Sequence, residues 1–371
     1  MKILYVTTIS NTVNAFLIPH IKMLIEDDNQ VDVAFSIKQE PALTLKQSDC
    51  NIHNIDFNRS PLNLSNIKAY KQLKELIIEG QYDLVHTHTP VASVITRLAC
   101  RNLKDIRVFY TAHGFHFFKN ASYKAWLLFY PIEKWLSKYT DTLITINKED
   151  YETVQEKNFK MKQIKHVHGV GVNLNQIEKQ TVSQQQHYRV KYSYSESSFI
   201  IFYAAELNNN KHQDLLIHAI DKVKDTIPNI KVIFAGKGPL EKEYKNEVNA
   251  LGLDRYVDFL GYCDKVNDFL VLSDLVVATS RREGLPVNIL EALAVGLPII
   301  ATDIRGHNEL VKNNENGFLF DTDDVHGLAD LIIAMYKDKK KANQFSKKSQ
   351  EIVKRYSLVN VLTELREAYR S

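Results

Sequence analysis

A chain of 371 residues is long for one domain and comfortable for two. Its 44% hydrophobic and 25% charged residues are ordinary globular values, and a net charge of +3 says little about partners. The three widely spaced cysteines argue against a disulfide framework or a zinc site, and no segment approaches the ~18 apolar residues needed to span a bilayer. Because the N-terminal apolar run is also too short for a signal peptide, we expect a soluble or peripheral cytoplasmic protein.

In the first half of the chain, short apolar runs alternate with segments whose apolar residues have helical spacing. The predicted strands are 3–7, 31–36, 52–57, 82–86, 107–111 and 142–146, and the clearest predicted helices are 14–25, 64–79 and one from about Ala92. Strands that alternate with helices predict a mostly parallel, doubly wound sheet, which binds ligands at the carboxyl ends of its strands.

The pattern is interrupted by a polar stretch and then resumes. Residues 176–198 are rich in Gln, Ser, Asn and Lys, which predicts a linker. The strands predicted after it are 199–204, 230–235, 256–260 and 274–279, and the helices are 212–224, 239–250 and 265–272. A second α/β domain of about 160 residues fits this pattern.

The segment after the last of these strands has an unusual acidic pattern. Pro286 suits the first position of a helix, which places Glu283 in the preceding loop and Glu291 inside the helix. The amides of Gly284 and Leu285 then face whatever binds at the helix start, where a phosphate is favoured. Two carboxylates beside an anion site suit hydroxyl groups attached to the phosphates, as in a nucleotide sugar. An acidic loop before an ordinary helix is the alternative.

Glu283 and Glu291, with seven residues between them, resemble the E-x7-E signature of the retaining GT-B glycosyltransferases of family 4. The similarity continues through 296–302 and 306–311, and a more diffuse similarity covers nearly the whole chain. The resemblance implies two Rossmann-like doubly wound parallel-sheet domains that face each other across a cleft. It also implies that Glu283 contacts the donor hexose and Glu291 the ribose.

The expected domains follow from the pattern and the resemblance together. We expect an acceptor domain at 1–175, the linker at 176–198 and a nucleotide-sugar domain at 199–355. The resemblance implies that a last helix, 356–371, crosses back to the first domain.

Lys211 opens a helix, where a cation is normally unfavourable unless it neutralises an anion such as a diphosphate. Members of the family usually carry Gly-Arg-Leu shortly before this lysine, and both cations hold the phosphates. Here the matching residues include Glu206 in place of the arginine, so more of the diphosphate contact falls on Lys211. Arg281 or Arg282 is a possible compensation, although an exposed loop arginine is more often solvated.

Two further donor-binding residues follow from loop positions. Gly236 lies in a glycine-bearing turn at a strand end, which is weak evidence alone but matches the family loop near the nucleobase. Tyr262 follows the next strand, where family members commonly receive the base, and an ordinary surface aromatic is the alternative.

Histidines cluster in the first half, at 86, 88, 113 and 116. Without an acidic or cysteine partner at ligand spacing, a metal site is disfavoured. His113 matches the family histidine that faces the donor hexose, so we assign it a catalytic role with Glu283, in orientation and charge stabilisation. Asp321 and Asp323 are expected in a solvated loop, because GT-B enzymes do not use a metal in the manner of Asp-x-Asp transferases.

Between Arg101 and Tyr139 there are seven Lys or Arg and two Asp or Glu, together with both tryptophans. Aromatic and basic residues suit the headgroup region of a membrane, so we expect this segment to dock on the inner face of the cell membrane. A helix packed into the core is the alternative, and no recognised nucleic-acid module accompanies the patch.

The sequence thus predicts a retaining transferase that moves a hexose or N-acetylhexosamine, expected to be UDP-linked, to a lipid-linked saccharide in capsule or exopolysaccharide synthesis. No cofactor and no metal are expected, and protein partners stay unassigned. Two rival functions are a non-catalytic GT-B subunit that binds a partner transferase and a soluble enzyme of the sucrose- or glycogen-synthase type.

Overall fold

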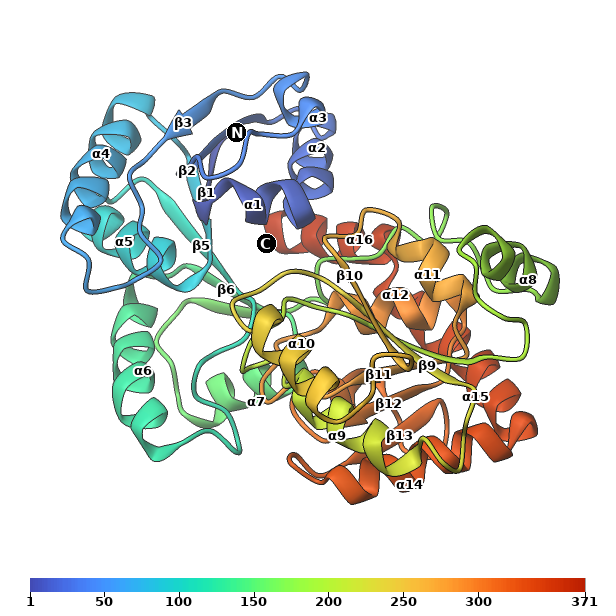
Figure 1. The fold of residues 1–371 in the computed structure, drawn as a ribbon. Helices are drawn as coiled ribbons and strands as arrows, with labels where there is room; N and C mark the ends of the chain where they lie inside the picture. The colour runs from blue at the N-terminus through green and yellow to red at the C-terminus, as the bar shows by residue number, and fades with distance from the viewer. Residues whose placement is uncertain (371) are drawn as a thin grey trace. The chain divides into compact units, whose positions relative to one another are not determined.

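The computed structural model describes residues 1–370, which form two compact domains (Figure 1). One comprises Met1–Val170 together with the chain from Val359 onward, and the other comprises Gly171–Leu358. Each domain is built on one parallel sheet covered by helices, so the expected class of two doubly wound α/β domains is confirmed.

The first domain contains a seven-stranded parallel sheet of order β3-β2-β1-β4-β5-β6-β7. Its strands are β1 (Lys2–Ile9), β2 (Gln30–Ser36), β3 (Ile52–Asn54), β4 (Leu84–His88), β5 (Arg107–Ala112), β6 (Thr142–Thr145) and β7 (Gln163–His166). Alternate side chains of a strand face opposite sides of the sheet, so β1 places Tyr5 in one core and Leu4 in the other.

Helices cover both faces of this sheet (Figure 1). The core that contains Tyr5 is closed by η1 (Val13–Leu17), α2 (Ile18–Glu26) and the C-terminal helix α16 (Leu358–Arg370). The core that contains Leu4 is closed by α4 (Ser65–Gly80) and α5 (Pro90–Cys100). The short helices α1 (Ser10–Thr12) and α3 (Leu43–Lys46) and the helix α7 (Lys148–Glu156) complete this part of the domain.

The first helical segment was predicted as one continuous helix, but it includes a π-helical turn at Val13–Leu17. Pro19 lies directly after this turn, at the start of α2. Proline has no amide proton, and its ring clashes with the carbonyl four residues earlier, so the regular α-helical pairing is interrupted there.

Helix α6 (Tyr123–Leu136) follows β5 and begins at Ser122, whose side chain accepts a hydrogen bond from the amide of Ala125. Its inner face is tied to α5 by a buried ion pair, in which Arg97 Nη1 lies 2.8 Å from Glu133 Oε2. The turn η2 (Ser137–Tyr139) then leads to β6.

The second domain contains a six-stranded parallel sheet of order β10-β9-β8-β11-β12-β13. Its strands are β8 (Phe199–Ala204), β9 (Ile230–Ala235), β10 (Val257–Gly261), β11 (Leu275–Ala278), β12 (Ile299–Thr302) and β13 (Gly317–Phe320). Its helices are α9 (Gln213–Val223), α10 (Glu241–Ala250), α11 (Val266–Leu272), α12 (Val287–Val295), α13 (His307–Leu310), α14 (Val325–Lys337) and α15 (Lys339–Ile352), followed by η3 (Val353–Tyr356).

The stretch 176–198, which we predicted to be a linker, contains helix α8 (Val182–Lys191). Its polar sequence gives little helical signal, but Arg189 is buried and fixes the helix to the second domain. The guanidinium donates to Leu272 O at 3.0 Å and to Asp274 Oδ2 at 2.7 Å. Tertiary hydrogen bonds, and not an apolar stripe, therefore hold α8 in place.

The order of the second sheet defines where a ligand is expected. The chain builds outward from β8 to β10 and then returns to place β11 on the other side of β8. Loops at the carboxyl ends of β8 and β11 therefore diverge to opposite sides, which is the usual ligand position in doubly wound sheets.

Candidate functional site

The loops that follow β8 and β11 are joined by hydrogen bonds. Asn210 Nδ2 donates to Arg282 O at 3.0 Å, and the amide of Arg281 donates to Asn210 O at 2.8 Å. The Tyr203 hydroxyl donates to Lys211 O at 2.8 Å, and Thr279 Oγ1 lies 2.6 Å from His212 O and 2.9 Å from Lys211 O. The lysine is therefore held from the strands beneath it.

Lys211 and Glu283, predicted separately as a phosphate contact and a sugar contact, form an ion pair in the structure. Lys211 Nζ lies 2.5 Å from Glu283 Oε1, and both side chains are largely buried. Burial raises the pKa of Glu283, but the Lys211 ammonium and the neighbouring His307 bring that pKa below its ordinary value. Burial likewise lowers the pKa of Lys211, and the Glu283 carboxylate more than offsets this effect. Both groups are therefore charged.

Glu291 stands on α12 and behaves differently. Burial alone raises the pKa of its carboxyl to about 7. Across residues 1–370 no hydrogen bond or ion pair is made by this carboxylate, whereas Glu283 has Lys211. Glu291 is half-buried, and a partly desolvated acid without a protein partner is an acceptor ready for hydroxyl donors.

The start of α12 differs by one position from the prediction. Pro286 is the residue before the first helical turn, with an extended ψ of 121°, and the helix begins at Val287. Such a shift lies within the usual uncertainty of helix ends. Leu285 is buried and Gly284 is half-buried, so the loop runs against the domain rather than out into solvent.

Gly236 and Tyr262, the predicted base-side residues, lie on adjacent strand ends. The backbone of Gly236 packs on Ala205, and a Cβ at Gly236 would lie only 1.9 Å from Ala205 O. Glycine is thus required here for the close approach of two loops, whatever else the loop binds. Tyr262 follows Gly261 and is 78% exposed.

The two arginines considered as replacements for a cation at position 206 have different surroundings. Arg281 Nη1 pairs with Asp323 Oδ1 at 2.9 Å, and Asp323 is exposed in a loop, as expected. Burial, together with the nearby Arg305, lowers the pKa of Arg282. Glu206 is exposed at the same end of the sheet.

His113 belongs to the first domain, at the carboxyl end of β5. Its Nε2 lies 3.0 Å from Nδ1 of the buried His88. The neighbouring His86 contacts Tyr369 of α16 through Nδ1 and Thr111 Oγ1 through Nε2. Burial lowers the pKa of His113 to about 4, so the imidazole is neutral at pH 7. In the described part of the chain, no group of three or more His, Cys, Asp or Glu is placed to hold a metal ion.

Sequence reasoning missed the turn between β12 and α13. Arg305 Nε donates to Glu283 O at 3.0 Å, which fixes the acidic loop from behind. Gly306 and His307 follow in the same turn. Gly306 lies against Gly284 O of the β11–α12 loop, and the Glu283 carboxylate of that loop raises the pKa of His307. These residues fall within the segment whose similarity to the family was noted, but no role followed from their spacing.

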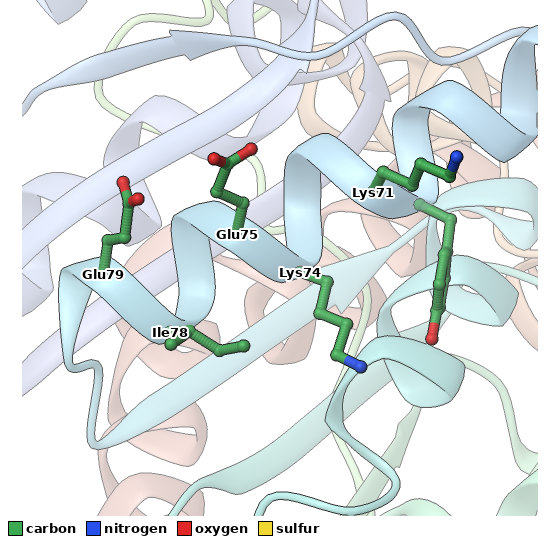
Figure 2. Close-up of a pocket in the computed structure, with 6 residues that line it drawn as sticks. Lys71, Lys74, Glu75, Ile78 and Glu79 are labelled. Atoms are coloured by element: carbon green, nitrogen blue, oxygen red, sulfur yellow. The ribbon is translucent and has the colours of Figure 1, made fainter.

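A shallow groove also lies along α4 of the first domain, lined by Tyr70, Lys71, Lys74, Glu75, Ile78 and Glu79 (Figure 2). Glu75 and Glu79 project from one side of the helix, and Lys74 and Ile78 project from another. None of these residues was predicted to belong to the site. No helix within residues 1–370 combines the length and apolar character that a membrane span requires.

Comparison with known proteins assigns the chain to a family. The model of glycosyl transferases group 1 matches residues 184–352, and the model of glycosyl transferase 4-like proteins matches residues 2–147. With two parallel-sheet domains and these matches, the chain belongs to the GT-B glycosyltransferases of family 4. It is 38% identical to EpsD of Bacillus subtilis (strain 168) over 371 residues, which cover 99% of this chain and 96% of that protein.

Three other similarities bear on ligand and fold. The UDP-Gal:alpha-D-GlcNAc-diphosphoundecaprenol alpha-1,3-galactosyltransferase of Escherichia coli is 27% identical over 310 residues, covering 82% of this chain and 80% of that protein. The crystal structure of Anabaena Alr3699/HepE in complex with UDP superposes with a TM-score of 0.81 at 21% identity, covering 100% of both chains. Sucrose-phosphate synthase of Thermosynechococcus elongatus superposes with a TM-score of 0.83 at 17% identity, covering 100% of this chain and 98% of that one.

Proposed function

We propose that this glycosyltransferase is a retaining, metal-independent enzyme that moves a hexose or N-acetylhexosamine from a UDP-sugar to a lipid-linked saccharide. One observation carries the proposal: the Lys211–Glu283 pair joins the loops after β8 and β11 at the switch point of the second sheet, and Glu291, whose carboxyl has no protein partner among residues 1–370, stands on the helix α12 that follows. A cation for a diphosphate and two acceptors for hydroxyl groups are the chemistry that a nucleotide sugar requires. The UDP in the Anabaena complex and the donor named for the Escherichia coli enzyme support uracil as the base.

Each group has a definite task in this proposal. Lys211 exchanges Glu283 for the diphosphate and stabilises the negative charge that develops on it during transfer. Glu283 accepts hydrogen bonds from the hexose, and Glu291 accepts them from the ribose. His113, neutral and hydrogen-bonded to His88, orients the hexose by hydrogen bonding. Retention is proposed to follow front-face attack, in which the leaving diphosphate takes the proton of the acceptor.

The acceptor and its process rest on relatives. The acceptor named for the Escherichia coli enzyme is linked to diphosphoundecaprenol, and 27% identity over most of both chains supports a lipid-linked saccharide here. We place the enzyme in capsule or exopolysaccharide synthesis, at the inner face of the membrane.

The donor assignment is tested by thermal unfolding with UDP, GDP and a panel of UDP- and GDP-sugars. A ligand at 100 times its dissociation constant stabilises the native state by about 2.7 kcal/mol. Stabilisation by UDP compounds alone, with slow release of UDP from one UDP-sugar, is expected. Proton NMR of the product reports the anomer, and EDTA should leave turnover unchanged. Binding without any turnover would favour the non-catalytic subunit, and transfer to fructose or glucan would favour the sucrose- or glycogen-synthase type.

The membrane contact is proposed for one face of α6, which we call the α6 outer face. Five large apolar side chains of this helix are 41–80% exposed: Tyr123, Leu127, Leu128, Ile132 and Trp135. At 100° per residue they lie within one half of the helix circumference, with Lys124 near the middle. Trp126, the other tryptophan of the segment, faces inward: it packs on Phe117 and donates to Phe118 O at 3.0 Å.

This face combines apolar area with positive charge, as anionic lipid surfaces require. Liposome co-sedimentation should show binding to vesicles with anionic lipid that falls with salt, at about 1 kcal/mol per basic residue near the surface. Replacing Leu127 and Leu128 by serine should remove binding, while donor hydrolysis continues. The matched control replaces Ile78 and Leu43, which are exposed on other helices of the same domain. Equal loss in both variants would refute the assignment to α6.

A further inference from the structure

The turn between β12 and α13 packs against the loop that contains Glu283, which we call the acidic loop. Gly306 has a φ of +82°, and a Cβ at this position would lie 2.6 Å from Gly284 O. Only a glycine permits this backbone conformation together with this contact at low cost. With Arg305 donating to Glu283 O, the turn touches two successive residues of the loop. Side chains of the turn therefore belong to the same site as Glu283.

His307 is the first residue of α13 and is fully buried. Its Nδ1 lies 3.1 Å from Thr302 O and 3.0 Å from Thr302 Oγ1. A carbonyl oxygen only accepts, so Nδ1 must carry the proton. Thr302 Oγ1 gives its own proton to Ser280 O at 2.6 Å and thus also meets Nδ1 as an acceptor. The two contacts select one tautomer, in which Nε2 carries a lone pair.

That lone pair is unused. Among all residues that the structure describes, His307 Nε2 has no hydrogen-bond partner, although it is covered from solvent. A buried polar atom without a partner is costly and calls for an explanation. Burial lowers the pKa of His307 to about 4, the Glu283 carboxylate raises this pKa and the Lys211 ammonium lowers it. The ring is therefore neutral and within electrostatic reach of both members of the ion pair.

We propose that His307 Nε2 accepts a hydrogen bond from one hydroxyl group of the transferred sugar, reached when the Lys211–Glu283 pair opens to admit the donor. The inference rests on the proposed function, because it needs a donor sugar at Glu283. A neutral acceptor near a carboxylate favours a ligand group that donates a hydrogen bond, and a sugar hydroxyl is such a group. A donor that lacks this hydroxyl would leave the nitrogen buried and unpaired, so His307 is a specificity-determining residue.

Two variants separate a ligand contact from a structural one. In His307→Asn the amide nitrogen takes the place of Nδ1 and keeps the bond to Thr302 O, but nothing replaces Nε2. In His307→Gln the longer side chain places an acceptor near Nε2 and gives up the bond to Thr302. If His307 only supports the turn, Asn preserves function and Gln does not. If Nε2 contacts the sugar, the order is reversed.

The measurement is the dissociation constant of UDP, of the best UDP-sugar from the panel and of each monodeoxy analogue of that sugar. We expect the native protein to reject one analogue by about 10- to 100-fold. His307→Asn should bind UDP as the native protein does, lose a similar factor for the parent sugar and no longer distinguish that analogue. His307→Gln should retain part of the discrimination. His326→Asn, on an exposed position of α14, is the matched control.

The outcomes are separable. If His307→Asn binds the parent sugar normally, or rejects every analogue as the native protein does, this inference is wrong while the proposed function stands. If the native protein discriminates against no deoxy analogue, the inference fails without any variant. If the native protein binds neither UDP nor a UDP-sugar, the proposed function fails and this inference fails with it.

Discussion

Replacing Glu291 by glutamine should make the protein more stable and a poorer binder of nucleotides. Burial raises the pKa of this carboxyl from 4.5 to about 7. At about 1.4 kcal/mol per pH unit, this rise corresponds to about 3 kcal/mol of preference for the neutral acid in the folded state. Stability from this group is therefore complete below pH 4.5 and is lost as the pH rises through about 7.

The glutamine variant has the same size and no ionisation. The difference in unfolding free energy between Glu291→Gln and the native protein should therefore grow by about 3 kcal/mol in favour of the variant between pH 4.5 and pH 8. Because the prediction concerns how this difference changes with pH, any effect of the amide on stability that does not depend on pH cancels. Binding should move in the opposite direction, since charge-assisted hydrogen bonds to the ribose contribute about 1.5–3 kcal/mol.

Both effects can be followed in one set of experiments. Urea unfolding by far-UV circular dichroism gives the stability, and hydrogen exchange of peptides from β11 and α12 localises it to the second domain. Tryptophan fluorescence cannot serve, because both tryptophans lie in α6 of the first domain. The ligand for the pH series is a UDP-sugar, because it lacks a terminal phosphate monoester that titrates near pH 6. Affinity for this ligand should rise with pH through about 7 in the native protein and should not change with pH in the variant.

Two results would refute this reasoning. A stability difference that does not change with pH would mean that the carboxyl is not desolvated in the folded protein. An unchanged affinity for UDP in a folded variant would mean that Glu291 does not hold the ribose.

Three further changes have definite expected outcomes. Lys211→Met leaves Glu283 buried without its cation, so the free energy of unfolding should fall by roughly 3–5 kcal/mol. Calorimetry should also show weakened UDP binding, and an unchanged UDP affinity would mean that Lys211 does not contact the diphosphate. Glu133→Ala leaves the guanidinium of Arg97 unpaired and should destabilise the first domain by roughly 3–5 kcal/mol, seen in tryptophan fluorescence; a loss below 1 kcal/mol would contradict the buried pair. Gly306→Ala forces a Cβ onto a carbonyl at positive φ and should cost roughly 1–3 kcal/mol and weaken UDP-sugar binding, and a neutral result in both assays would show that the turn is not a rigid wall.

The parallel sheets were predictable because their strands are apolar on both faces. β8 and β9 have the predicted bounds, since β8 is a continuous apolar run, β9 is apolar except for Lys231, and both end in polar or glycine-bearing turns. Helix α8 was not predictable, because Arg189 stabilises it through groups that are distant in the sequence. Local sequence signals cannot report such bonds.

The site was predictable only in part, for a related reason. Lys211 was found as a cation at a predicted helix start and Glu283 from the loop before a helix and the family signature, but their direct pairing depends on β8 and β11 being neighbours in the sheet. His307 was missed because the role proposed for it depends on a tautomer, which Thr302 determines through tertiary contacts. Whether Gly236, Tyr262 and His113 contact a donor stays a prediction.

The position of α16 in the chain has a consequence for biosynthesis. Val361, Leu365, Ala368 and Tyr369 of this helix fill the same core as β1, although the whole of Gly171–Leu358 is translated between them. At 5–20 residues per second, the ribosome needs on the order of ten to forty seconds to make that intervening part. During this time the first domain has all of its strands but lacks one covering helix, so an apolar face of its sheet is open. The domain that is made first is thus completed last.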